Sequence, residues 1–73
     1  MLYHQFVALL EEVAEMAEER NENLFFGQTC FSPQDAKDIL PSLWARAGEE
    51  GRATFARALR KQQIELATAE FAS

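Results

Sequence analysis

The spacing of apolar residues predicts helices along most of this chain. Residues 2–21 carry apolar side chains every three or four positions, which is the period of one helix face. The core stripe of this first helix is Phe6, Leu10, Val13 and Ala17. Asn21 and Asn23 are suitable residues for its end, because Asn is common where helices terminate.

A start signal for a second helix lies at residues 32–35. Ser32 can cap the helix, Pro33 suits its first position, and Asp35 can reach back as in a capping box. A helical period then continues as far as Gly48 through Ala36, Ile39, Leu40, Leu43, Trp44 and Ala47. Pro41 lies inside this pattern, so we expect either one bent helix or two short ones.

Residues 48–51, with a glycine at each end, are predicted to form a tight turn before a third helix over residues 52–71. The inner stripe of this third helix is Phe55, Leu59, Gln62 and Leu66. The expected fold is therefore all-α, a small three-helix bundle, or a kinked four-helix bundle if Pro41 divides the second helix. At 73 residues, the chain (residues 1–73) is expected to be a single small helical domain.

An apolar connector, residues 24–31, joins the first two helices, with Gly27 as its flexible point. It contains three aromatic residues, Phe25, Phe26 and Phe31. Because loops normally lie on the surface, these side chains either cap the core or are exposed for a partner.

Charge is concentrated in the first helix. The net charge is −5, and residues 1–23 already account for it, with one arginine against six glutamates. These glutamates are Glu11, Glu12, Glu15, Glu18, Glu19 and Glu22. On a helix they occupy one arc of roughly 120°, although like charges three or four positions apart destabilise a helix. This acidic arc predicts a surface for a basic partner; the alternative is a solvated face without a partner.

The third helix has a second face on which basic and apolar residues alternate: Arg57, Arg60, Lys61, Ile64 and Phe71. This face either contacts a partner or a second copy of the chain, or it is solvated. Residues 33–71 also have helix–turn–helix order, so DNA binding through the third helix is an alternative function. Glu49 and Glu50 in the predicted turn, and the acidic first helix, would repel phosphate, which makes nucleic acid an unfavourable ligand.

The sequence contains no recognisable catalytic or metal-binding constellation, and we expect no enzyme activity and no cofactor. Cys30 is the only cysteine and His4 the only histidine, and nothing near either residue would orient a base or form an oxyanion hole. We expect Cys30 to be structural, and a lone cysteine favours a reducing cytoplasm. The longest apolar run, residues 7–10, is far too short to cross a membrane, and no signal peptide is evident.

In size, acidity and Ala/Arg-rich composition, the chain resembles small bacteriophage-encoded host-takeover proteins, which include inhibitors and antiterminators that bind bacterial RNA polymerase. The resemblance implies a non-enzymatic regulator in the cytoplasm of a bacterial host, with a larger protein of basic surface as its partner. In such a complex, aromatic anchors would supply affinity, and the candidates are Phe25, Phe26, Trp44 and Phe71. Anti-CRISPR proteins and quorum-sensing anti-activators share the profile, and a helical homodimer is a further alternative.

Overall fold

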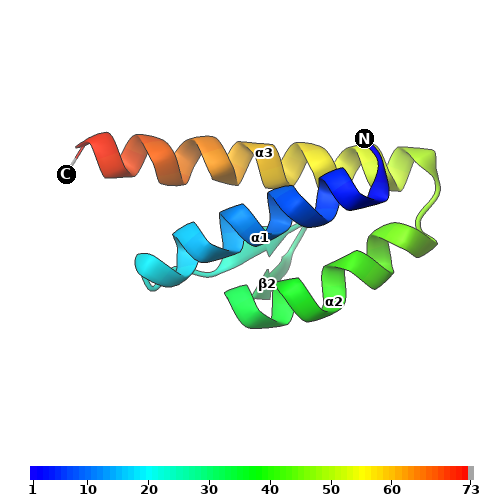
Figure 1. The fold of residues 1–73 in the computed structure, drawn as a ribbon, viewed down its shortest axis with the longest axis horizontal. Helices are drawn as coiled ribbons and strands as arrows, with labels where there is room; N and C mark the ends of the chain where they lie inside the picture. The colour runs from blue at the N-terminus through cyan, green and yellow to red at the C-terminus, as the bar shows by residue number, and fades with distance from the viewer. Residues whose placement is uncertain (73) are drawn as a thin grey trace.

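The structure, a computed structural model, describes the backbone of residues 1–72 and the side chains of residues 1–69. Its elements are α1 (Tyr3–Glu19), β1 (Leu24–Phe26), β2 (Thr29–Phe31), α2 (Pro33–Arg46) and α3 (Glu49–Ala72). In Figure 1, α1 lies between α2 and α3 and contacts both, while β1 lies against α3 and β2 against α2. The predicted three-helix arrangement is confirmed in outline, with a two-stranded antiparallel sheet added. The side chain of Phe71, a predicted partner contact, lies outside the described residues.

The apolar stripe of α1 forms the centre of the core. All four predicted residues of this stripe are buried, and Ala14 is buried beside them. The helix ends at Glu19, and Asn21 adopts φ 55°, a left-handed conformation that Asn tolerates better than most residues. Glu22 therefore lies beyond the helix, so five glutamates share the helix face, where six were predicted.

Residues 24–31 form a β-hairpin, and the prediction of an apolar loop there is wrong. Leu24 pairs with Phe31 and Phe26 with Thr29 across a two-residue turn. Gly27 occupies the first turn position with φ 65°, as a type II′ hairpin turn requires. The sequence did contain this signal, because two runs of strand-forming residues are separated by two residues beginning with glycine.

α2 continues through Pro41 as one helix, so the four-helix alternative is wrong. The predicted cap is present: the backbone N–H of Asp35 donates to Ser32 Oγ at 3.2 Å, and Pro33 occupies the first turn. A proline inside a helix costs about 3 kcal/mol. Leu40 and Trp44 are both buried in the same helix, and each contributes roughly 1.5–3 kcal/mol, which offsets that cost.

The connection between α2 and α3 is shorter than predicted. α3 begins at Glu49, so Glu49 and Glu50 lie in its first turn, where the helix dipole favours acidic side chains. The backbone N–H of Arg52 donates to the Gly48 carbonyl at 2.9 Å, which closes that turn. A Cβ at Gly51 would lie 3.1 Å from the Ala47 Cβ, so the absence of a side chain permits this close approach.

Candidate interaction surfaces

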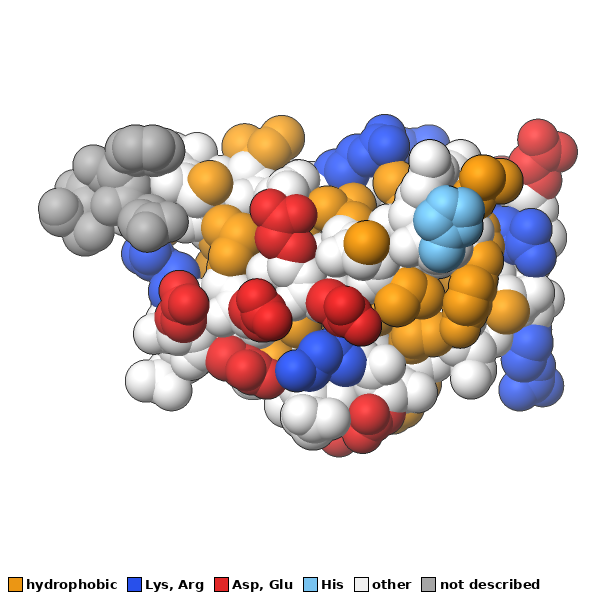
Figure 2. Space-filling view, viewed as in Figure 1, with side chains coloured by type: hydrophobic (Ala, Val, Ile, Leu, Met, Phe, Trp, Pro, Cys, Tyr) orange, Lys and Arg blue, Asp and Glu red, His pale blue; other side chains and the backbone are white. Residues whose placement is uncertain are grey.

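The acidic face of α1 is exposed to solvent along its whole length. Its members are Glu11, Glu12, Glu15, Glu18 and Glu19, and we call them the acidic face. Figure 2 shows acidic side chains gathered over the C-terminal half of α1. One ion pair is found within the described part of the chain, between Lys37 Nζ and Glu18 Oε1 at 3.2 Å. Both partners are partly exposed, so the pair contributes only about 0–1 kcal/mol.

Glu15 is the centre of the acidic face. It lies three or four positions from every other member, namely Glu11, Glu12, Glu18 and Glu19. Four like-charge neighbours cost about 1–2 kcal/mol in total, at roughly 0.2–0.5 kcal/mol per pair. The last turn of α1 also contains glutamates and no basic residue, which opposes the helix dipole. The acidic face therefore destabilises the isolated molecule.

An exposed apolar area adjoins the acidic face. Leu2 and Tyr3, at the start of α1, are 61% and 51% exposed, and Ile39 and Leu43 of α2 are also exposed. Figure 2 shows hydrophobic side chains beside the acidic ones on the same face of the molecule. Sequence reasoning assigned Ile39 and Leu43 to the core period of the second helix. The missed signal was the number of apolar positions in that helix, which exceeds what one buried stripe can hold.

The predicted aromatic anchors have different environments. Phe25 is 57% exposed, whereas Phe26 is 6% exposed and belongs to the core. Trp44 is 3% exposed; it stacks on Phe6, with ring centroids 5.2 Å apart, and lies close to Tyr3 at 6.1 Å. Phe26 and Trp44 are thus core residues in this fold, and Phe25 is the accessible aromatic of the three.

Gln62 of α3 holds β1 through its side-chain amide. The backbone N–H of Phe25 donates to Gln62 Oε1 at 2.6 Å, and Gln62 Nε2 donates to the Phe25 carbonyl at 2.9 Å. Gln62 Nε2 also donates to the Ala58 carbonyl at 3.1 Å. In an antiparallel pair of strands, every second residue directs its backbone N–H and carbonyl away from the partner strand. Phe25, opposite Cys30 and between the pairs Leu24–Phe31 and Phe26–Thr29, is such a residue, so its backbone groups are free to bond to Gln62. The sequence placed Gln62 in the inner stripe without indicating this role.

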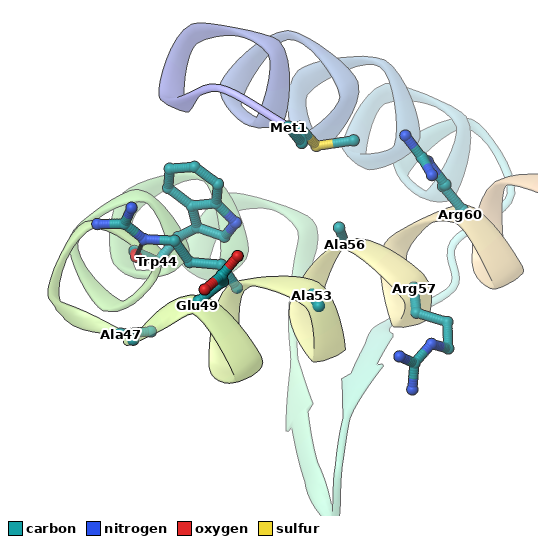
Figure 3. Close-up of a pocket in the computed structure, with 10 residues that line it drawn as sticks. Met1, Trp44, Ala47, Glu49, Ala53, Ala56, Arg57 and Arg60 are labelled. Atoms are coloured by element: carbon teal, nitrogen blue, oxygen red, sulfur yellow. Dashed lines mark hydrogen bonds between the residues drawn. The ribbon is translucent and has the colours of Figure 1, made fainter.

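Arg57 and Lys61 are exposed on α3, as is Arg60. Arg57 and Arg60 line a cleft of about 970 Å³ between the end of α2 and the first turns of α3, while Lys61 lies outside it (Figure 3). The cleft is also lined by Met1, Trp44, Ala47, Gly48, Glu49, Arg52, Ala53 and Ala56.

Arg52 fixes the orientation of Trp44 at this cleft. Its guanidinium carbon lies 4.7 Å from the centre of the indole ring, Arg52 Nε donates to the Trp44 carbonyl at 3.1 Å, and Nη2 donates to the Ala45 carbonyl at 3.0 Å. These carbonyls belong to the last turn of α2, where backbone donors are few; the Trp44 carbonyl also accepts from the Ala47 N–H at 3.2 Å. Arg52 thereby ties α3 to the C-terminal end of α2.

No protein-family model, curated protein or solved structure matches this chain. Its function has to be inferred from the surfaces described above.

Cys30, which the sequence predicted to be structural, lies on β2 as a free, exposed cysteine and does not belong to the core. Among the described residues, no group of three or more His, Cys, Asp and Glu side chains is placed to hold a metal ion. No helix in the described part of the chain is long and apolar enough to cross a membrane.

Proposed function

We infer that this protein is a non-enzymatic regulator that docks on a larger protein with a basic surface. The supporting observation is the exposed acidic face of α1 beside the exposed apolar area around Leu2, Tyr3, Ile39 and Leu43 (Figure 2). Acidic residues steer association with a basic partner and set the orientation of the complex, while a neighbouring apolar area supplies affinity. A partner that neutralised the acidic face would also relieve the repulsion around Glu15.

The same surface argues against self-association as its purpose. A twofold symmetric dimer brings one patch against its own copy. Here that contact would place two rows of glutamates together, with Lys37 as the nearest cation on α2. Nucleic acid would be repelled for the same reason, since it carries a dense negative charge. A different protein of positive surface potential is the occupant that this surface fits.

The first partner to test is bacterial RNA polymerase, the target of the phage regulators that the chain resembles in size and charge. The channel of a polymerase must be basic because it holds DNA. An acidic helix can occupy such a channel through the interactions that otherwise hold phosphates. In this proposal the protein acts in the bacterial cytoplasm and modulates transcription without catalysing a reaction.

The test compares Glu15→Lys with Glu50→Lys in binding to purified RNA polymerase, measured by biolayer interferometry. Both variants change the net charge equally, but Glu50 lies in the first turn of α3, away from the acidic face. Glu15→Lys should slow association several-fold to about tenfold, with a smaller effect in high salt. Glu18 is left unchanged because reversing it would also break the ion pair with Lys37.

The stability of the two variants supplies the control. Glu15→Lys should raise the thermal midpoint because it replaces four repulsive pairs with attractive ones. Weaker binding by a more stable variant cannot be attributed to unfolding. Equal binding by both variants would refute docking through the acidic face, and failure of the unmodified protein to bind would refute RNA polymerase as the partner.

A further inference from the structure

The cleft between α2 and α3 is a second candidate site, independent of the acidic face. It lies at the junction of α2 and α3, at the opposite end of the molecule from the C-terminal end of α1 (Figures 1 and 3). Its lining contains three arginines and one glutamate, Arg52, Arg57, Arg60 and Glu49. A local excess of cations in a chain of net charge −5 favours an anionic ligand.

A buried, unpaired hydrogen-bond donor lies in the same cleft. Within the described residues, Trp44 Nε1 is one of two buried polar side-chain atoms without a partner, the other being Arg20 Nε. The indole ring is 3% exposed and is held by Phe6 on α1 and Arg52 on α3. Figure 3 shows the ring edge that carries the nitrogen facing the interior of the cleft. Buried donors are nearly always paired, so an unpaired one at a cleft is available to an acceptor that binds there.

The rest of the lining is apolar, and most of its residues are small. Met1, Ala47, Ala53 and Ala56 leave open space between the charged side chains. A volume of about 970 Å³ lies within the range of small-molecule sites and is far larger than a single inorganic anion needs. The combination of apolar lining, cations and one N–H donor suits a molecule with an apolar body and an acidic group.

We propose that this cleft binds a small organic anion, whose oxygen accepts the hydrogen bond of Trp44 Nε1 and whose charge is balanced by Arg57 and Arg60. In Figure 3, Arg60 extends from α3 toward α1 and Arg57 extends from the opposite side of α3; both are exposed, so their side chains are free to turn toward a ligand. Met1 lines the cleft on the same side as the indole, and its side chain is unbranched and flexible. Arg52 is a positioning residue, because its Nε and Nη2 donate to carbonyls of α2.

The indole N–H of Trp44 reports binding directly, because the chain has one tryptophan and hence one indole resonance. The experiment titrates ¹⁵N-labelled protein with 2-naphthoate and, separately, with neutral 2-naphthamide and with inorganic phosphate. With 2-naphthoate we expect a saturable downfield shift of the indole proton, as it gains an anionic acceptor. We expect no saturable shift with 2-naphthamide.

Two double variants test the role of the arginines. Arg57→Gln with Arg60→Gln should weaken 2-naphthoate binding about tenfold or more, because charge-assisted hydrogen bonds are the strong ones. Arg46→Gln with Lys61→Gln changes the charge equally outside the cleft and should leave binding unchanged. Trp44→Phe removes the donor and keeps an aromatic ring; ligand-detected NMR should show weaker binding, with circular dichroism confirming the fold.

Three results would overturn the proposal. A shift that rises linearly without saturation would show that there is no site. Equal binding of 2-naphthoate and 2-naphthamide would show that charge is not recognised. Phosphate binding as tightly as 2-naphthoate would show that an apolar body is not required. None of these results depends on the acidic face of α1, so the two proposals stand or fall separately.

Discussion

The amide of Gln62 is the most specific tertiary contact in this protein, and replacing it gives a sharp prediction. Gln62→Leu keeps most of the side-chain volume and remains compatible with a helix. It removes the hydrogen bonds to the backbone N–H and carbonyl of Phe25, at 2.6 and 2.9 Å. It also removes the bond to the Ala58 carbonyl, which still accepts its helical partner. The substitution therefore isolates the link between α3 and β1.

The expected loss of stability follows from the two bonds to Phe25. Each intramolecular hydrogen bond contributes about 0.5–1.5 kcal/mol net, so together they contribute about 1–3 kcal/mol. Phe25 is partly open to solvent, and water can replace part of what is lost, which places the result toward the lower half of that range. For a domain of this size, with a urea m-value of about 1 kcal/mol/M, the midpoint should fall by about 1–2 M.

Urea unfolding followed by circular dichroism measures this change. The matched control is Gln63→Leu, at the adjacent, partly buried position that makes no contact with the hairpin among the described hydrogen bonds. Hydrogen exchange should show the Phe25 amide losing protection in Gln62→Leu, while that of Phe26, which pairs with Thr29, changes less. A destabilisation below about 0.5 kcal/mol, or one equal to that of Gln63→Leu, would refute the argument that these bonds anchor the hairpin.

Four further substitutions test single elements by urea or thermal unfolding. Glu15→Gln should stabilise the protein by about 1 kcal/mol, with a smaller gain in high salt, because it removes four repulsive pairs; no gain would show that the acidic face is not strained. Ser32→Ala should cost about 1 kcal/mol by removing the cap on the Asp35 N–H, unlike Ser42→Ala on the exposed side of the same helix. Gly27→Ala should cost about 1 kcal/mol through its φ of 65° alone, since a Cβ there meets no atom within 4 Å; Gly48→Ala, which is not at positive φ, is the comparison. Pro41→Ala should stabilise α2 by up to about 3 kcal/mol by restoring a backbone N–H, and a loss instead would show that the ring packs better than alanine.

The helices were predictable because their signals are local. The apolar period of α1 and the cap at Ser32 lie within one or two helical turns, and both are present in the structure. Boundaries were less accurate where two elements compete for the same residues. The pair of glycines at positions 48 and 51 indicated a turn, but burial of Leu59 and Leu66 along α3 favours a helix that begins at Glu49.

The hairpin and the site depended on contacts between distant residues. Phe25 and Phe26 are adjacent and chemically identical, yet Phe25 is exposed and Phe26 is buried. Successive side chains of a strand point to opposite faces, so this difference follows once the segment is known to be a strand. In α2, five of the predicted apolar positions follow the helical period, and the approach of α1 and α3 determines that Ala36, Leu40 and Trp44 are the buried ones. The unpaired indole nitrogen could not be predicted, because Phe6 and Arg52 determine the position of the Trp44 ring. Phe6 is far from Trp44 in the sequence, and Arg52 belongs to the next helix.

The exposed thiol of Cys30 makes the covalent state of this protein depend on its surroundings. The chain has no second cysteine, so oxidation can join Cys30 only to another molecule. Two copies would then be joined through β2 by an intermolecular disulfide bond, which forms without complementary protein surfaces. A dimer that disappears on addition of a reducing agent would therefore be a product of thiol chemistry. The same thiol gives a single attachment point for a fluorescent label on the hairpin, at a position that lines neither the cleft nor the acidic face.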